Sequence, residues 1–288
     1  MTLPAYGCVV LTQGRRPQQL RTALDSLLAQ TGVRLDVVVV GNGWQPVGLP
    51  EGVRALALPG DVGVPAGRAA GVPAVAGQLL LFLDDDAWLP EPGTLAEVAR
   101  RFAADPRLGL LQPRVADPAG GPAPRRWVPR LRVGDPARSS DVAAVWEGAV
   151  VVRRDVYEQA GGWPVEFVYG HEGIDLAWGV WDAGARVRYA GDLVVHHPVV
   201  PPARHPGAHR TWARNRVWLA RRRLPAPLGA VYVLVWLALT VVRSRRPADL
   251  AQALLGYRDG LARPPALRRP VSWRAVWRMT LAGRPPVV

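Results

Sequence analysis

Short apolar runs alternate with amphipathic segments through the first hundred residues, and this alternation constrains the fold more than any other feature. Tyr6–Thr12, Leu35–Val40 and Leu79–Leu83 are rich in Val and Leu, and glycines or aspartates follow each run. Continuous runs of this kind are typical of strands buried on both faces. Between the first two runs, Gln18–Gln30 places leucines at helical spacing. Strands that alternate with helices predict an α/β fold with a doubly wound, mostly parallel sheet, whose ligands bind beyond the carboxyl ends of the strands.

The same patterns continue to about residue 200. Val53–Leu58 is a further candidate strand, and the glycine-rich segment Gly60–Gly71 leads into a short helix. The remaining predicted strands are Leu108–Val115, Val145–Val152 and Val187–His196, and the remaining predicted helices are Thr94–Ala104 and Gly173–Asp182. Residues 117–140 are rich in Pro, Gly and Arg, which predicts a mobile loop.

The net charge of +13 is distributed unevenly along the chain. Residues 201–288 hold 17 arginines against two acids, Asp249 and Asp259, so this part carries about +15 and the rest is close to neutral. We therefore expect a body at 1–205 and a helical, basic appendage at 206–288. The single cysteine, Cys8, cannot form an intrachain disulfide, and Met1–Gly14 lacks the pattern of a secretory signal. Both observations favour the cytoplasm.

An apolar run of 15 residues, Leu228–Val242, lies inside the basic appendage. A membrane-spanning helix needs about 20 residues, with a lower limit near 17. Arginines flank the run at both ends, which favours a helix lying on the anionic inner face of the cell membrane without crossing it. A buried core helix is the alternative. The run argues against a third interpretation, nucleic-acid binding by the basic appendage.

Three aspartates, Asp84, Asp85 and Asp86, directly follow the apolar run Leu79–Leu83. Adjacent carboxylates repel one another, so a fold keeps them together in water or around a cation. Magnesium takes one or two protein carboxylates and completes its shell with water and substrate phosphates. A solvated acidic turn is the alternative. The position at a strand end favours a metal and phosphate site.

A second acidic pair, Glu172 and Asp175, stands at the start of the predicted helix Gly173–Asp182. Residues three apart share one face of a helix, and the positive end of the helix dipole stabilises anions there. An ionised carboxylate in such a place suits a general base that deprotonates a hydroxyl. A capping pair of purely structural value is the alternative.

Several segments in this order resemble family-2 glycosyltransferases with the GT-A fold. They are VVLTQGRRPQQLRTALDSLLAQ, VVVVGNG, GDVGVPAGRAAG, LFLDDDAWLP, VYGHEGIDLAWGVWDAG and VVHHP, which together cover about residues 5–200. The resemblance implies an inverting transfer of a sugar from a UDP- or dTDP-sugar to an acceptor hydroxyl, with a divalent metal, Mg or Mn. By the same analogy, the acceptor would be a glycan or lipid-linked molecule of the cell envelope.

The resemblance also implies roles for individual residues. Asp86 would coordinate the metal, and His196, slightly favoured over His197, would complete the metal site. Glu172 would be the base, with Asp175 as its structural partner or as the alternative base. The residues in positions that contact the donor are Thr12, Asn42, Arg68, Asp84 and Asp85.

Other candidates stay open. Arg214 and Arg216 suit a clamp on the diphosphate, although a solvated or lipid-facing basic stretch is equally consistent. Trp163 is a candidate platform for the acceptor, with a place in the core as the alternative.

The chain also departs from the family pattern at several positions. Gly41 replaces the usual aspartate at the end of the second strand, and Asp61 and Ala69 stand in the glycine-rich segment where asparagine is common. Gly173 interrupts the usual Glu-Asp dyad, and Gly179 replaces an arginine. These departures leave a catalytically inactive nucleotide-sugar-binding protein as the alternative function.

Overall fold

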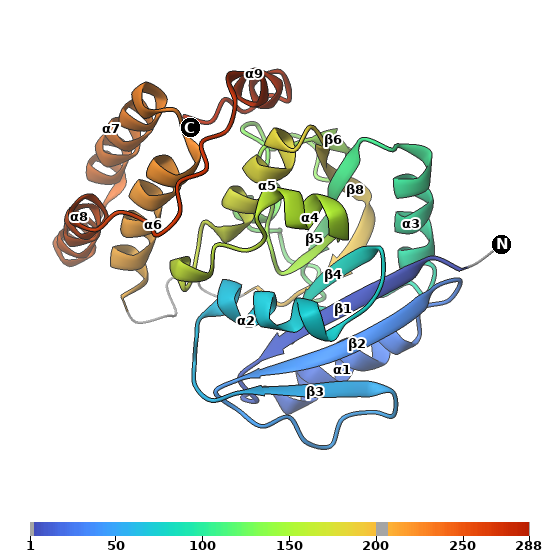
Figure 1. Ribbon diagram of the computed structural model, residues 1–288. Helices are drawn as coiled ribbons and strands as arrows, with labels where there is room; N and C mark the ends of the chain where they lie inside the picture. The colour runs from blue at the N-terminus through green and yellow to red at the C-terminus, as the bar shows by residue number, and fades with distance from the viewer. Residues whose placement is uncertain (1–2, 200–206, 288) are drawn as a thin grey trace.

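The computed structural model describes residues 3–199 and 207–287, which form one mixed sheet covered by helices on both faces (Figure 1). The strands are β1 (Ala5–Thr12), β2 (Arg34–Asn42), β3 (Val53–Leu58), β4 (Leu79–Asp84), β5 (Leu108–Ala116), β6 (Ser140–Asp141), β7 (Ala149–Arg153) and β8 (Arg186–His196). The longer helices are α1 (Pro17–Leu28), α2 (Val64–Gly71), α3 (Thr94–Ala104), α4 (Arg154–Ala160), α5 (Glu172–Asp182), α6 (Ala208–Arg223), α7 (Ala226–Arg243), α8 (Pro247–Ala262) and α9 (Trp273–Leu281). Three short 3-10 turns lie at Val72–Ala74, Arg125–Trp127 and Val165–Phe167.

The sheet has eight strands in the order β3-β2-β1-β4-β7-β5-β8-β6. Strands β3, β2, β1 and β4 are parallel, as are β5 and β8, so the expected mostly parallel sheet is confirmed. Strand β7 runs antiparallel to both of its neighbours, which the sequence pattern did not predict. The start of β7 therefore lies at the carboxyl end of β4, where the Asp84 amide donates to the Gly148 carbonyl at 2.8 Å.

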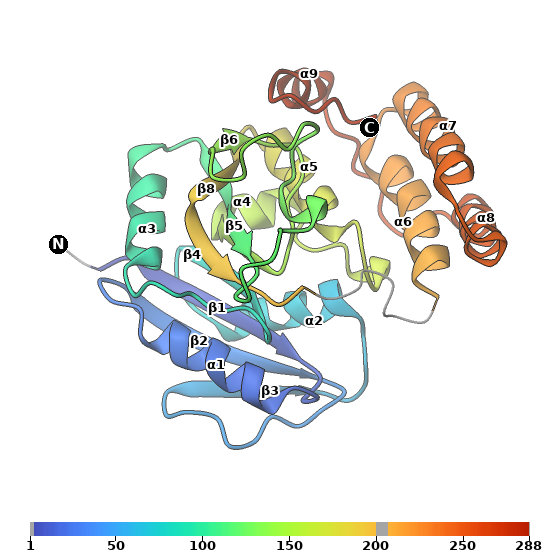
Figure 2. The ribbon, with the colours of Figure 1, turned by 180° about the vertical axis from the view of Figure 1, so that it is seen from behind.

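Alternate residues of the central strands face two different cores. Cys8 and Val10 face α1 and α3, whereas Val9 faces the side that carries α2, α4 and α5 (Figure 2). Cys8 is fully buried, and burial raises the pKa of its thiol, as is usual for an unreactive core cysteine. Both faces of the central strands are thus covered by helices, as their continuous apolar runs predict.

The helices after residue 206 continue the core of the body. Leu219 and Leu224 of the α6 region and Met279 of α9 belong to the same apolar cluster as Trp178 and Trp181 of α5. The predicted boundary at 205/206 lies outside the described residues, so the division into 1–205 and 206–288 stays a prediction.

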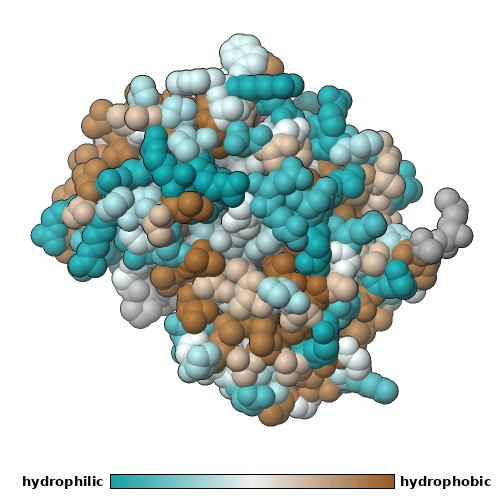
Figure 3. Space-filling model, in the orientation of Figure 1, coloured by the Kyte–Doolittle hydropathy of each residue, from teal (hydrophilic) through white to brown (hydrophobic). Residues whose placement is uncertain are grey.

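The apolar run 228–242 lies within α7, an 18-residue helix with a mean hydropathy of 1.8. By length and composition it is long enough to cross a membrane, and only 6% of it is buried. Helix α7 packs on α6 near Gly229 and on Trp178 of α5 through Tyr232, while Val231, Leu234 and Val242 are exposed. Apolar side chains gather over α7 at the left edge of Figure 3, next to hydrophilic ones.

Candidate functional site

The acidic triplet lies at the carboxyl end of β4, beside the end of β1. The Thr12 hydroxyl donates to Asp85 Oδ2 at 2.6 Å, and the Gly14 amide donates to Thr12 Oγ1 at 3.0 Å. Arg16, at the start of α1, contacts the carboxylates of both Asp85 and Asp86. Sequence reasoning missed Arg16, although its place directly before the first predicted helix put it at the same edge of the sheet.

Asn42, at the end of β2, anchors the loop that precedes α2. Its Nδ2 donates to Asp61 Oδ1 at 2.7 Å, and its Oδ1 accepts from the Val62 amide at 2.9 Å. Gln13 holds the second oxygen of Asp61 at 2.7 Å. The family pattern has an aspartate at position 41 and an asparagine in the loop. Here Gly41 is followed by Asn42 and the loop carries Asp61, so an amide and a carboxylate still pair at this edge.

Gly41 has no room for a side chain, because a Cβ there would lie 1.9 Å from the Trp44 carbonyl oxygen. An aspartate at that position would require the following turn to move. Asp61 therefore supplies the acidic group near this strand end from the neighbouring loop.

Arg68 projects from α2 toward β4 and is buried. Its Nη2 donates to Asp84 Oδ1 at 2.5 Å, and its guanidinium lies over the Trp163 ring, 5.4 Å from the centroid. Burial opposes the charge on Asp84, but the charge and hydrogen bond of Arg68, together with other positive groups such as Arg16, outweigh it and lower the pKa of that carboxyl. These groups therefore keep Asp84 ionised at the strand end.

Asp84, Asp86 and His197 form a cluster that could hold a metal ion. One ligand atom from each lies within 4.8 Å of the others, and His197 Nε2 is 3.0 Å from Asp86 Oδ1. Two carboxylate oxygens and an imidazole nitrogen suit Mn²⁺ and tolerate Mg²⁺. His196 stands elsewhere: its backbone pairs with Trp88, and its ring packs edge-to-face on that indole at 5.5 Å. The structure thus brings His197, and not the slightly favoured His196, to the two aspartates, because successive residues of an extended strand point to opposite sides.

Two indoles enclose the His197 ring. Trp127 and Trp146 meet it edge-on, with centroid distances of 5.6 Å and 5.0 Å. Trp127 lies in the segment 117–140 and is buried, and its carbonyl accepts a 2.9 Å hydrogen bond from Gln112. Part of the segment that sequence composition marked as a mobile loop is thus anchored beside the candidate metal site.

Glu172 is the first residue of α5 and is fully buried. A Cβ at Gly173 would lie 2.7 Å from Glu147 Oε2, so Glu147 occupies the space that a side chain at 173 would need. Glu147 thus brings a second carboxyl to the position where the usual dyad has its aspartate. Sequence reasoning missed Glu147, because only the antiparallel direction of β7 carries it to this edge.

Burial raises the pKa of Glu172. Burial and the neighbouring Glu172 charge raise the pKa of Glu147 well above its usual range, so Glu147 is the first of the two to hold a proton. The helix dipole alone had suggested an ordinary ionised carboxylate at 172. Desolvation outweighs the dipole here because the carboxyl is fully buried. A raised pKa suits a base that must accept a proton near neutral pH.

Asp175 is fully buried and is paired with two arginines of α6. Arg223 of α6 grips its carboxylate with two hydrogen bonds of 2.9 Å and 2.7 Å, and Arg222 Nε lies 3.0 Å from Oδ1. A Cβ at Gly179 would lie 3.0 Å from Arg223 Nη2. The guanidinium missing at 179 is thus replaced by one from α6.

The appendage also braces the loop before α5. Asn215 is fully buried, and its Nδ2 donates to the carbonyls of Phe167, Tyr169 and Gly170 at 2.8–3.0 Å. Its neighbour Arg214 bonds the Phe167 carbonyl and lies over Trp218, 4.2 Å from the ring centroid. Arg214 therefore holds protein groups and does not face the triplet.

Two further candidates occupy unexpected places. Trp163 is 3% exposed and packs edge-on against Phe82 at 5.0 Å, so it belongs to the core under Arg68 and offers no open face to an acceptor. Arg216 lies over Trp236, 4.5 Å from the ring centroid, and lines a cavity between α5 and α7. Its side chain is engaged there and not at the acidic triplet.

Comparison with known sequences agrees with this geometry. Residues 8–161 match the profile of glycosyl transferase family 2. A pre-mycofactocin glycosyltransferase of Mycobacterium tuberculosis is 29% identical over 227 residues, which cover 74% of this chain and 44% of that protein. This chain therefore matches less than half of the length of its curated relative.

Solved structures share the fold. GalNAc-T7 with UDP, GalNAc and Mn²⁺ superposes with a TM-score of 0.64 at 14% identity. The match covers 83% of this chain and 51% of the GalNAc-T7 chain. S. aureus TarS 1–349 with UDP-GlcNAc superposes with a TM-score of 0.62 at 12% identity. The match covers 89% of this chain and 80% of the TarS chain. A mannosyltransferase from Pyrobaculum calidifontis with GDP-Man and Mn²⁺ superposes with a TM-score of 0.55 at 17% identity. The match covers 100% of this chain and 78% of the mannosyltransferase chain. At these identities the likeness establishes the fold alone.

Proposed function

Because this chain belongs to glycosyl transferase family 2, we propose that it transfers a sugar from a UDP- or dTDP-sugar to an acceptor hydroxyl with inversion at the anomeric carbon. The observation that carries the proposal is the meeting of Asp84, Asp86 and His197 within 4.8 Å, next to Arg68. A polar ring of Thr12, Asn42 and Asp61 continues this edge toward the end of β2.

The donor set fits a divalent cation. Asp84, Asp86 and His197 would hold Mg²⁺ or Mn²⁺, whose charge would stabilise the diphosphate as the sugar–phosphate bond breaks. Arg16 contacts the same carboxylates, so we expect it to shift toward the phosphates when the cation is bound. Thr12, Asn42 and Asp85 orient the nucleoside in this proposal.

Glu172 takes the proton from the acceptor hydroxyl in the proposed reaction. Its burial and its neighbour Glu147 keep it in a region without competing water, where a carboxylate is a stronger base. The departures at Gly41, Gly173 and Gly179 coincide with groups supplied by Asp61, Glu147 and Arg223. This favours a working enzyme over an inactive nucleotide-sugar-binding protein.

Turnover of a panel of nucleotide sugars tests the proposal. Purified protein with Mn²⁺ or Mg²⁺ should release UDP or dTDP from one donor, slowly to water and faster to a suitable acceptor, and EDTA should stop the release. Binding of a donor with no release under any condition would instead identify the inactive alternative.

We further propose that the enzyme lies on the anionic, cytoplasmic face of the membrane and acts on a glycan or lipid-linked acceptor of the cell envelope. The path of the chain around α7 supports a peripheral position. Helix α8 returns along α6, and α9 packs on α5, where the Ser272 amide donates to Asp182 at 2.7 Å. Both ends of α7 therefore lead back to the catalytic body, while Leu234 and Val242 remain exposed.

Flotation with vesicles tests the peripheral position. The protein should float with phosphatidylglycerol vesicles, float less with phosphatidylcholine, and be released only partly by high salt, because salt screens charge but not apolar contact. Leu234→Asp with Val242→Asp should abolish flotation, whereas Leu28→Asp on the distant helix α1 should not. Protection of the C-terminus from protease inside sealed vesicles would show a spanning helix instead.

A further inference from the structure

Helix α9 exposes large apolar side chains on one face. Trp273, Trp277 and Leu281 are 61%, 62% and 69% exposed, and their spacing of four residues places them in one row along the helix. The opposite face is buried, with Ala275 and Met279 in the core that α9 shares with α5. A row of exposed large apolar side chains marks a surface that binds another molecule or a membrane.

Contacts with α5 hold this row in a fixed place. The Ser272 side chain caps the start of α9, and the Ser272 amide donates to Asp182 at 2.7 Å. Arg278 donates to the carbonyls of Trp181 and Ala185 at 3.2 Å and 3.1 Å. Because these contacts fix the buried face of α9 on the body, the exposed row points away from the body.

The surroundings of α9 are positively charged. Residues 263–284 contain six arginines and no Asp or Glu, and Arg274, which follows Trp273, is exposed. Burial and the charges of Arg274, Arg107 and Arg186 lower the pKa of Arg278, although an arginine stays charged at neutral pH. The row is therefore an apolar surface set among cations.

This chemistry favours an anionic lipid surface over a second copy of the chain. Tryptophan has large apolar rings and one N–H donor, and it is enriched at the headgroup layer of membranes. Arginine can lay its stem on apolar surface while its charge reaches lipid phosphates. A symmetric dimer through α9 would instead bring the arginines of two identical faces together, which like-charge repulsion opposes.

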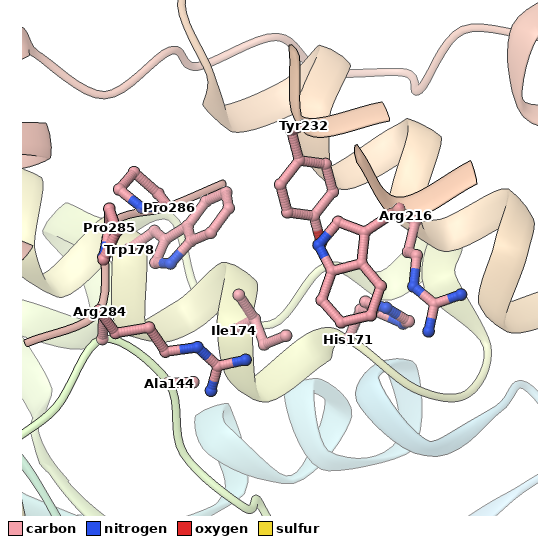
Figure 4. Close-up of a pocket in the computed structure, with 11 residues that line it drawn as sticks. Ala144, His171, Ile174, Trp178, Arg216, Tyr232, Arg284, Pro285 and Pro286 are labelled. Carbon is pink, nitrogen blue, oxygen red and sulfur yellow. The ribbon is translucent and has the colours of Figure 1, made fainter. Parts of the chain in front are cut away.

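Helix α9 also adjoins the exposed helix α7. Pro285 and Pro286, which follow α9, line one wall of a small cavity, and Tyr232 of α7 lines another (Figure 4). Both helices lie at the end of the molecule opposite β3 (Figures 1 and 2). The exposed residues of α7 and the row on α9 therefore belong to the same end of the protein.

We propose that Trp273 and Trp277 insert into the headgroup layer of an anionic membrane, so that α9 is a second membrane-binding helix beside α7. This inference rests on the proposed peripheral position of the enzyme. A body attached through one helix can roll about the axis of that helix, and a second contact prevents this motion. Because α9 packs on α5, the contact sets the orientation of the helix that carries Glu172 relative to the membrane.

Fluorescence of the full chain labelled at one site tests the insertion. Cys8 is buried, so a cysteine introduced at the surface can be labelled selectively with the fluorophore NBD. NBD on Leu281→Cys, which keeps both indoles, should shift to the blue on phosphatidylglycerol vesicles and be quenched by lipids with a nitroxide headgroup. NBD on Leu28→Cys of α1 should show neither change. An unshifted and unquenched label at 281 in protein that floats with the vesicles would overturn the proposal.

Removal of the indoles gives a second test. Trp273→Ser with Trp277→Ser should weaken binding to phosphatidylglycerol vesicles by about tenfold or more, because an indole is a large apolar surface to return to water. Leu28→Ser should leave vesicle binding unchanged.

The outcomes separate this site from the proposals on which it rests. Unchanged flotation of the double tryptophan variant, with flotation lost in the α7 variant, would overturn the role of α9 and leave the peripheral position intact. Dimers that the tryptophan substitutions dissociate, together with unchanged vesicle binding, would identify a second copy as the occupant and overturn the proposal. Release of UDP or dTDP from the donor to water reports separately on the transferase function and should be equal in the unmodified protein and in the double variant.

Discussion

The carboxyl edge of the sheet and the face of α5 that meets the appendage are built in opposite ways. At the sheet edge, Asp84 and Asp86 gather negative charge around a space for a cation, and they follow one strand in sequence. On the α5 face, arginines from α6 approach Asp175 from residues nearly fifty positions away. The first region thus holds a group of acids, partly paired with Arg16 and Arg68, that leaves a candidate cation site, and the second joins α5 to the appendage through arginines.

The basic appendage therefore supports the helix that carries the proposed base, in addition to presenting the exposed apolar face of α7. Asn215 bonds three carbonyls of the loop before Glu172, and Arg223 fills space beside Gly179. Substitutions at Glu172 and at Asp175, both in the first turn of α5, should therefore separate the proposed chemistry from structural support.

The largest effect is expected for Glu172→Gln. The change keeps the shape and removes the basicity, so kcat should fall by about 10²–10⁴. The affinity for donor and the unfolding midpoint should change little, because the amide replaces a carboxyl that forms no ion pair with α6. Steady-state kinetics and thermal unfolding measure both quantities. Full activity of this variant would show that another group is the base. Glu172 and Asp175 would then not differ in the way proposed.

Asp175→Asn should instead act on stability. Removal of one partner from a buried ion pair costs about 3–5 kcal/mol, because Arg222 and Arg223 keep their buried charges. Urea unfolding measures the loss. Asp25→Asn, which breaks the exposed pair with Arg21, should cost less than about 1 kcal/mol. If the two variants proved equally stable, the arginines would not be holding α5 through Asp175.

The smallest effect concerns the acidic limb of kcat/KM against pH. Glu172 must be deprotonated to act, and its pKa is raised, so activity should appear only above the usual titration range of glutamate. The protonated Glu147 carboxyl lowers the pKa of Glu172 by hydrogen bonding to it. Glu147→Ala should therefore move the limb to higher pH, and Glu147→Gln, which retains a donor, should move it less. If the acidic limb of kcat/KM lay at the same pH in the unmodified protein and in both Glu147 variants, Glu147 would have no influence on the proposed base.

The sheet edge could be predicted well from sequence. Thr12, Asn42 and Asp84 each end an apolar strand, and parallel strands bring such ends together. Val37–Val40 and Leu79–Leu83 carry patterns too continuous for any other element. The doubly wound sheet, and the position of the candidate nucleotide-sugar site at its carboxyl edge, follow from those local patterns.

The α5 face could not be predicted in the same way. Glu147 reaches Gly173 only because β7 runs antiparallel, and strand direction leaves no mark in a short valine-rich run. The choice between His196 and His197 depends on which side of the strand end faces Asp86. Arg223 joins Asp175 across 48 positions of the chain, a contact that residue periodicity does not report.

In the proposed site, Asp84 and Asp86 at the sheet edge bind a metal and diphosphate, with His197 as the imidazole ligand. The most direct test is calorimetric titration of UDP with and without Mn²⁺ into the unmodified protein, His197→Ala and His196→Ala. The structure predicts that Mn²⁺ strengthens UDP binding in the unmodified protein and in His196→Ala. In His197→Ala that gain should fall by about tenfold or more, the size found when a metal site loses even a supporting group. The proposed metal site would be wrong if Mn²⁺ failed to strengthen UDP binding in His196→Ala alone. It would also be wrong if Mn²⁺ had no effect on UDP binding in the unmodified protein and in both variants.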